Sequence, residues 1–290
     1  MPSGRRREDY DPRLVAVCRS CFISSADRIP AALRDVFICV GGWAPTLHQE
    51  GGLLEQGEGH IGSIDLDWIF DLEGLRQALN GEQPDLARYV ADMSLPDPKG
   101  RAKFTRLVSR DGVAGVLATD FLVAAGASES SDSVLVGNLR AFKPPGSDVA
   151  LQGTSLLKLQ GRSFEKNEIE LSVRVASPAA IFAMKMYSME DSLRRTGQDA
   201  GKEGRLKDSY DANFIIRAYP GGPKALAQGL KNAQPENTAQ GAIRLLRKNF
   251  ETRASPGWNL LKGFEASSPR KEEIVNQSFV RFRALIDELH

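Results

Sequence analysis

The alternation of apolar and polar residues is most regular between Gly62 and Phe70. The apolar members of this segment, two residues apart, are Ile64, Leu66, Trp68 and Phe70. A period of two is the pattern of a β-strand, in which successive side chains point to opposite faces. The segment therefore predicts a strand with one wholly apolar face, and Asp65 and Asp67 share the other face.

Two further apolar runs flank this segment. Residues 36–40 form a nearly continuous apolar run that ends at Gly41 and Gly42. Residues 115–124 form a second run with Asp120 at its centre. Each run has the length of a buried strand. After the two glycines, residues 43–48 are expected to open a helix with a proline in its first turn.

The chain changes character near residue 177. Strand patterns dominate residues 36–175, and an N-terminal helix with a charged tail precedes them. Helices are predicted at residues 178–195, 207–218, 223–232, 238–252 and 271–289. We therefore expect an α+β fold. A domain of mixed sheet and helices spans residues 1–176, and a C-terminal helical bundle at residues 177–290 closes over it.

The composition places few limits on function. The chain has 290 residues, 41% hydrophobic and 26% charged, which is enough to bury a core in one large or two modest domains. No apolar run reaches about 18 residues, and the start lacks the apolar stretch of a secretion signal. We expect no membrane segment and a cytoplasmic location. The net charge of +1 provides no global footprint for nucleic-acid binding.

Asp65 and Asp67 are the first candidates for chemistry. Aspartate is depleted in strands, and two carboxylates about 7 Å apart on one face repel each other. Mg²⁺ relieves that repulsion, because it takes oxygen ligands and is commonly held by one or two carboxylates together with substrate phosphates. Asp120 becomes a third ligand if its strand lies beside theirs. The alternatives are two solvated acids on an edge strand, and a bulge or strand end that exposes Asp120.

Gly41 and Gly42 are candidates for an anion contact. Consecutive glycines at a strand-to-helix turn let the backbone approach a ligand closely, and the exposed N–H groups favour an anion. The pattern matches neither the phosphate-loop motif nor the dinucleotide-binding motif. The alternative is a tight turn without a ligand.

Lys185 is the only charge in the first part of a helix that is otherwise apolar nearly all round. A buried lysine needs an anionic partner or a lowered pKa. If this helix faces the acidic strand, the ammonium reaches a nucleotide phosphate, and its removal leaves stability unchanged or higher. The alternative is a side chain that extends along the surface and keeps its head in water.

Asp208 and Asp211 lie one turn apart on the next predicted helix. Together with Ile215 they fall on one helical face, so we expect that face to be turned toward the active site. The alternative is a surface pair between Lys207 and Asp211, which stand four residues apart and would contribute a few tenths of a kcal/mol.

Taken in order, these features resemble a known superfamily. A Gly-Gly turn after the first strand, an Asp-x-Asp strand and a later strand with a third Asp resemble the nucleotidyltransferases related to DNA polymerase beta. The segments FICVGGWA, GSIDLDWIF, IFAMKMYSM and RLKDSYDANFII are similar to motifs of the AbiEii/AbiGii toxin family of nucleotidyltransferases, known from abortive-infection and toxin–antitoxin systems. The resemblance covers residues 36–216, with four motifs in the same order.

The resemblance implies roles residue by residue. It implies nucleotide-phosphate contacts at Gly41, Gly42, Ser63 and Lys185, metal binding at Asp65 and Asp67, and a lysine/aspartate helix motif at Lys207, Asp208 and Asp211. The chain departs from the family at one point. Many members carry Arg-x-Thr before the Asp-x-Asp strand, where this chain has Ile61 and Ser63. His60 is the nearest basic group, and it is expected to supply part of the missing phosphate contact.

The expected function is Mg²⁺-dependent transfer of a nucleotide from an NTP to an acceptor hydroxyl, with the NTP bound between the two domains. The expected catalytic residues are Asp65, Asp67, Lys185, Asp208 and Asp211. The resemblance implies an RNA acceptor such as tRNA, and a toxin that a cognate antitoxin neutralises. Three alternatives stay open: a small-molecule (antibiotic-type) nucleotidyltransferase, a metal-dependent nuclease, and a non-catalytic nucleotide-binding protein with the same fold.

Overall fold

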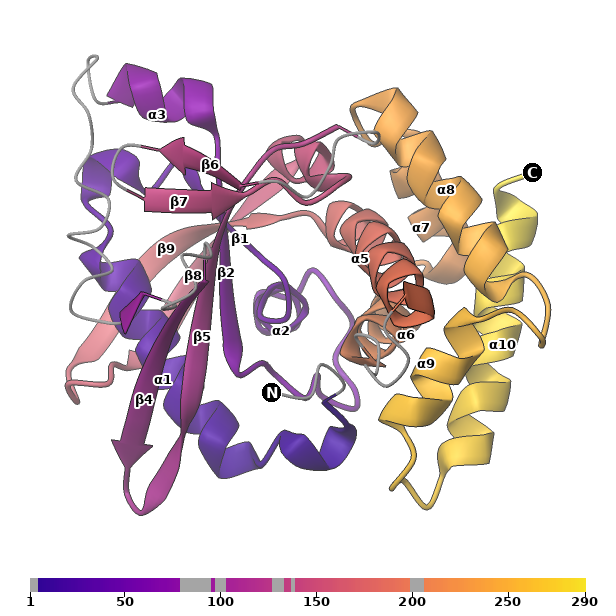
Figure 1. Cartoon of the computed structure of the whole chain (residues 1–290), viewed down its shortest axis with the longest axis horizontal. Helices are drawn as coiled ribbons and strands as arrows, with labels where there is room; N and C mark the ends of the chain where they lie inside the picture. Colours follow the sequence, from indigo (N-terminus) through magenta and orange to yellow (C-terminus); the bar gives the residue numbers. More distant parts are fainter. Residues whose placement is uncertain (1–4, 79–94, 97–102, 127–132, 137–138, 199–205) are drawn as a thin grey trace.

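A mixed β-sheet lies on one side of the molecule and most of the helices gather on the other (Figure 1). The computed structural model describes residues 5–78, 95–96, 103–126, 133–136, 139–198 and 206–290. Over these residues the chain is α+β, as the hydrophobic patterns predict. The strands come before residue 177, and the helices α5 to α10 follow it.

The described residues form nine strands in one sheet. The strands are β1 (Phe37–Val40), β2 (Asp65–Phe70), β3 (Leu95–Pro96), β4 (Lys103–Arg110), β5 (Val113–Val123), β6 (Ser133–Val136), β7 (Leu139–Phe142), β8 (Thr154–Arg162) and β9 (Glu168–Ala176). Their order is β3-β4-β5-β2-β1-β9-β8, with β7 also paired to β5 and β6. β2 pairs antiparallel with β1 and parallel with β5, so the strand that carries both aspartates lies inside the sheet.

The register between β2 and β5 confirms the expected neighbourhood of the third aspartate. Asp67 pairs with Asp120 across the two parallel strands. Asp120 lies within β5 and not at its end, so the strand-end explanation for this residue is wrong. The solvated edge-strand explanation for Asp65 and Asp67 is wrong for the same reason, because β2 has a neighbour on each side.

The apolar face of β2 is buried in an aromatic cluster. Helix α1 (Pro12–Arg28) begins with Asp11 as its cap, since the Asp11 side chain accepts a hydrogen bond from the Arg13 N–H. From α1, Phe22 stacks on Trp68 of β2, with 5.5 Å between ring centroids, and on Trp43 at 5.8 Å. Burial of Leu66 and Trp68 leaves Asp65 and Asp67 on the opposite face.

The helices α2 (Ala44–Glu50) and α3 (Leu72–Ala78) follow β1 and β2. The later helices are α5 (Pro178–Gln198), α6 (Leu206–Ala218), α7 (Gly222–Lys231), α8 (Glu236–Phe250), α9 (Gly257–Phe264) and α10 (Lys271–Glu288). α2 lies between the sheet and α5 and α6 (Figure 1). One continuous hydrophobic core joins both halves of the chain, from Trp68 through Phe182 to Trp258.

Two predictions for this half need correction. No helix is predicted between residues 252 and 271, because Pro256 and Gly257 disfavour one, yet the helix α9 starts at Gly257. Burial of Trp258, Leu261 and Phe264 against neighbouring helices stabilises α9, so the tertiary contacts outweigh this unfavourable start. The helix α5, predicted to end at residue 195, continues to Gln198. Among the described helices, none combines the length and the hydropathy needed to cross a membrane.

Candidate active site

The two consecutive glycines lie directly against the aspartate strand. Gly41 follows β1, and a Cβ atom at this position would lie 1.8 Å from Oδ2 of Asp67. Its φ of +68° also falls in the left-handed region, which favours glycine. The Asp67 carboxylate therefore occupies the space that a side chain at position 41 would fill. The glycine turn and this carboxylate are in direct contact.

Gly42 connects this turn to a residue from the second half of the chain. A Cβ atom at Gly42 would lie 2.6 Å from Oγ of Ser63 and 2.9 Å from Nζ of Lys207. The Ser63 hydroxyl also accepts a hydrogen bond of 3.2 Å from the Asp65 N–H. The glycine turn, the serine, the aspartate strand and an ammonium group from α6 thus meet at one point, although Lys207 lies far along the sequence from the others.

Asp65 and Asp67 could hold an Mg²⁺ ion only together with further ligands from water or substrate. Among the described residues, no group of three or more His, Cys, Asp or Glu side chains is arranged to hold a metal ion, so the three aspartates are not a preformed cage. Oδ1 of Asp65 is buried and has no hydrogen-bond partner among those residues. One or two carboxylates with waters and phosphate oxygens are the usual Mg²⁺ site, and Asp65 and Asp67 supply such a pair.

Lys185 lies in a buried ion-pair cluster between α5 and α6. Its Nζ is 2.7 Å from Oδ1 of Asp208 and 2.8 Å from Oδ2 of Asp211. Lys207 Nζ lies 2.6 Å from the other oxygen of Asp211, and the Ser188 hydroxyl donates to Asp208. The side chain of Lys185 is 12% exposed and that of Asp211 is 0% exposed. Two alternatives are therefore excluded: a Lys185 side chain that keeps its head in water, and a Lys207–Asp211 pair at the surface.

The cluster shifts the pKa values of its members. Burial opposes the charge of Lys185, but Asp208 and Asp211 hold the pKa of its ammonium above the ordinary value. Burial likewise opposes ionisation of Asp211, yet Lys185 and Lys207 lower the pKa of this carboxyl far below its usual range. Burial, assisted by the nearby Lys185, lowers the pKa of Lys207. Lys185 and Asp211 are thus firmly charged. Lys207 holds its proton less strongly than Lys185 does.

His60 forms a hydrogen bond with Asp211 through one ring nitrogen and is held in place through the other. Its Nδ1 accepts a hydrogen bond of 3.1 Å from the Gly62 N–H and lies 2.8 Å from the Thr46 hydroxyl. A backbone N–H only donates, so the ring proton is on Nε2, which donates to Oδ1 of Asp211 at 3.0 Å. Since the protein engages both ring nitrogens and buries the ring completely, this geometry supports a positioning role and not the expected phosphate contact.

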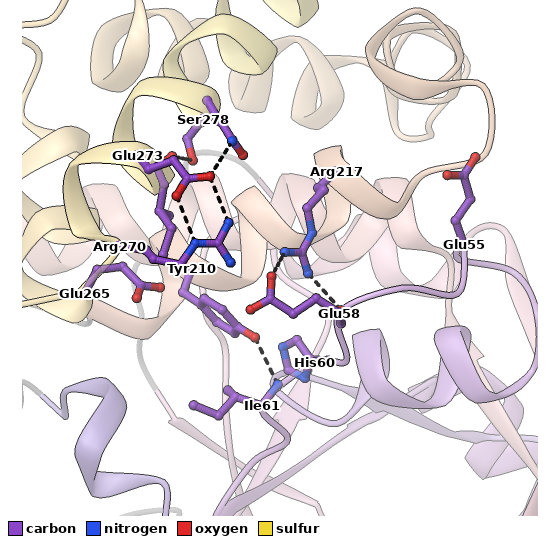
Figure 2. A network of polar contacts seen from close by, with 12 residues as sticks. Glu55, Glu58, His60, Ile61, Tyr210, Arg217, Glu265, Arg270, Glu273 and Ser278 are labelled. Carbon is purple, nitrogen blue, oxygen red and sulfur yellow. Dashed lines mark hydrogen bonds and ion pairs between the residues drawn. The ribbon is translucent and has the colours of Figure 1, made fainter. Parts of the chain in front are cut away.

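The segment that leads into β2 is held against α6 by a network of polar contacts (Figure 2). The Tyr210 hydroxyl accepts a hydrogen bond of 3.0 Å from the Ile61 N–H. Arg217 donates to the Glu58 carboxylate at 2.7 Å and to the Glu58 carbonyl at 2.9 Å. Together with the His60–Asp211 contact, these bonds fix the position of Ser63 and Asp65 relative to α6.

The N-terminal segment also contacts the site residues, through Arg5 and Tyr10. The sequence patterns did not connect this segment to the site. Arg5 Nη1 lies 2.5 Å from Oδ2 of Asp65. Tyr10 is buried, and Lys207 Nζ lies 5.5 Å from the centre of its ring. The Arg-Arg-Arg run at residues 5–7 reads only as a charged tail, because no local pattern indicates which acidic residue it meets.

The structure thus places all of the predicted site residues in two adjoining groups. The first contains Gly41, Gly42, Ser63, Asp65, Asp67 and Lys207, with Asp120 beside Asp67 in the sheet. The second contains Lys185, Lys207, Asp208, Asp211 and His60. Lys207 belongs to both.

A scan against models of protein families finds no match to the chain, and a search of curated proteins finds no similar sequence.

Gly41→Ala is expected to damage the site while Gly52→Ala does not. Both glycines have a positive φ, so each substitution costs about 1 kcal/mol of stability from backbone strain. Only at Gly41 does the new Cβ overlap Asp67, since nothing lies within 4 Å at Gly52. If Asp67 takes part in catalysis, its displacement by about 1 Å lowers turnover roughly 100-fold. Activity and thermal unfolding of both variants test this, and equal activity of the two contradicts it.

His60 is expected to make stability depend on pH. Burial, followed by the nearby Lys207, lowers the pKa of its ring from 6.5 to about 4. Between these values the unfolded chain binds a proton that the folded chain does not, so His60 costs stability as the pH falls from 6.5 to 4. Relative to His60→Gln, the wild-type protein should lose about 3 kcal/mol of unfolding free energy over that range. Urea titrations at several pH values measure it, and parallel curves for the two proteins would contradict it.

Proposed function

We propose that this chain is a metal-dependent nucleotidyltransferase of the polymerase-beta-like superfamily, similar to the AbiEii/AbiGii toxins. The observation that carries the proposal is the meeting of Gly42, Ser63 and Lys207 beside Asp67. An Asp-x-Asp strand alone is a weak indication. The glycine turn contacts Asp67 at Gly41 and both Ser63 and Lys207 at Gly42, so a carboxylate, a hydroxyl and an ammonium group gather around one turn. These are the groups needed to bind a metal–triphosphate complex.

Each group has a defined task in this proposal. The backbone N–H groups at Gly41 and Gly42, with the Ser63 hydroxyl, bind phosphate oxygens. Asp65 and Asp67, with Asp120 alongside, would hold Mg²⁺, which when bound offsets the triphosphate charge and lowers the pKa of the acceptor hydroxyl. Lys207 is the ammonium group nearest the glycine turn and offsets charge on the phosphates.

Lys185, Asp208 and Asp211 act with Lys207 as one charged unit. Asp211 bridges the two ammonium groups, with Lys185 on one oxygen and Lys207 on the other. This arrangement fixes Lys207 at Gly42 and leaves the cluster balanced at two positive and two negative charges. Incoming phosphates therefore meet an ordered cation without a rearrangement of the site, which is the condition for strong electrostatic stabilisation of a transition state.

The acceptor and the biological role come from the sequence resemblance. The proposed acceptor is RNA, with tRNA as the first candidate, and the proposed role is that of a toxin restrained by an antitoxin. If so, expression of the wild-type chain arrests bacterial growth and expression of Asp67→Asn does not. Growth arrest by both proteins would contradict a role that depends on transfer.

The biochemical test uses purified protein, Mg²⁺ and each α-labelled NTP in turn with total RNA. Label on a tRNA-sized band, absent with Asp67→Asn, is the expected result. Parallel reactions with aminoglycosides replace the RNA, and label on the drug instead would assign the small-molecule alternative. Binding of NTP without transfer to either acceptor class would support the non-catalytic alternative. Cleavage of the RNA without labelling would support a nuclease.

A further inference from the structure

The N-terminal segment Arg5–Tyr10 lies over the candidate site and is fastened at several points. Arg7 forms a two-pronged ion pair with Glu265, at 2.8 Å from Nε to Oε2 and 3.0 Å from Nη2 to Oε1. The side chain of Glu265 is 1% exposed and that of Arg7 is 32% exposed, so only the Glu265 carboxylate is shielded from solvent. Tyr10 packs on Phe264 with 6.0 Å between ring centroids. The segment is thereby anchored to the end of α9 on one side of Arg5.

Arg5 reaches the metal-binding face from this anchored segment. Its guanidinium lies on Oδ2 of Asp65, while Oδ1 of the same carboxylate has no hydrogen-bond partner among the described residues. One cation therefore already rests on a carboxylate that the proposed function assigns to Mg²⁺. A divalent ion would bind the free Oδ1, and its two positive charges would repel the guanidinium on Oδ2 and weaken the contact between Arg5 and Asp65.

The guanidinium stays close to the site after that exchange. Arg5 is two residues from Arg7, which limits the separation of their Cα atoms to about 7 Å. The Arg7–Glu265 pair does not involve Asp65, so the anchor persists when Arg5 releases its partner. The freed guanidinium would then lie within a side-chain length of Asp65, where it could bind the phosphate oxygens of a nucleotide held at this carboxylate. Its planar fork of N–H donors matches phosphate better than any other side chain does.

We propose that Arg5 is a phosphate-binding residue that exchanges Asp65 for the triphosphate when metal and nucleotide bind. This inference rests on the proposed function, since it assigns a further residue to the same nucleotide site. It makes the N-terminal segment part of the substrate site and not a charged tail. Arg5 holds Asp65 in place while the site is empty and contacts the nucleotide once it is filled.

The experiment compares Arg5→Ala and Arg5→Lys with the wild-type chain and with Arg13→Ala. Arg13 is a matched control, because it lies eight residues further on, is 77% exposed and pairs only locally with Asp11. Calorimetric titration measures binding of Mg²⁺ alone and then of the four α,β-methylene NTP analogues with saturating Mg²⁺. Circular dichroism and thermal unfolding establish that each variant is folded.

Arg5→Ala is expected to weaken binding of the preferred analogue by at least about tenfold, the effect of losing a hydrogen bond to a charged group. Arg5→Lys retains the charge without the fork, so it should fall between Arg5→Ala and wild type. Mg²⁺ alone should bind at least as tightly to Arg5→Ala as to wild type. Arg13→Ala should match wild type in every titration.

Unchanged or tighter analogue binding by Arg5→Ala overturns the inference, since Arg5 would then only occupy the empty site. If Arg5→Ala does not fold, Arg5→Lys decides alone, and wild-type affinity of that variant overturns the inference. Failure of the wild-type chain to bind any analogue overturns the proposed function and the inference together. The two failures are therefore distinguishable by the behaviour of the wild-type protein.

Discussion

Asp67→Asn is expected to reduce nucleotide transfer by at least about 1,000-fold, because the loss of a metal-binding carboxylate removes several kcal/mol of transition-state stabilisation. The substitution keeps the shape of the side chain, which fills the space left by Gly41. It also removes one of two neighbouring carboxylates, since Asp67 and Asp120 occupy matching positions in the register of β2 and β5. The unfolding free energy should therefore change by less than about 1 kcal/mol.

Asp65→Asn should behave similarly in transfer, although it also weakens the contact with Arg5. Asp35→Asn is the matched control, since this aspartate is 77% exposed and pairs with Arg174. It should retain full activity. Steady-state kinetics at several Mg²⁺ concentrations, with thermal unfolding of each variant, provide the measurement. Near wild-type activity of Asp67→Asn at ordinary Mg²⁺ would remove these carboxylates from the chemistry.

Lys185→Met is expected to lower both activity and stability. Transfer should fall by at least about 100-fold, because Asp211 loses one of its two lysines and no longer holds Lys207 in a fixed position at Gly42. The sequence pattern alone predicts unchanged or higher stability, but the ion pairs reverse that prediction. Without the ammonium, Asp208 loses its lysine and the buried Asp211 retains only Lys207 and His60. Breaking a buried pair by removing one partner costs about 3 kcal/mol.

A double variant separates these two effects. Adding Asp208→Asn to Lys185→Met removes the carboxylate that is left without its lysine, so part of the lost stability should return. Activity should stay low, because the ammonium is still absent. Lys224→Met, at an exposed position of α7, is the control and should leave both quantities unchanged. Full activity of Lys185→Met with a lowered melting temperature would show that the cluster has a structural role only.

Local sequence pattern determined the elements that carry the site. The alternation around Asp65 and Asp67 predicts β2 and identifies its apolar face, since side chains on a strand alternate with a period of two wherever one face is buried. The glycine pair after β1 and Pro45 in the first turn of α2 are local conformational requirements, and both were readable. The spacing of Asp208 and Asp211 on α6 follows from helix geometry in the same way.

Only the tertiary structure decided which of these residues meet. Lys185 and Lys207 share Asp211 because α5 packs against α6, and Lys207 reaches Gly42 because α6 lies beside the turn after β1. The roles of His60 and Arg5 rest on partners roughly 150 and 60 residues away in the sequence. Periodicity reports only the side on which an element is buried. It carries no information about its partner, since packing and charge pairing depend on contacts between segments that are distant along the chain.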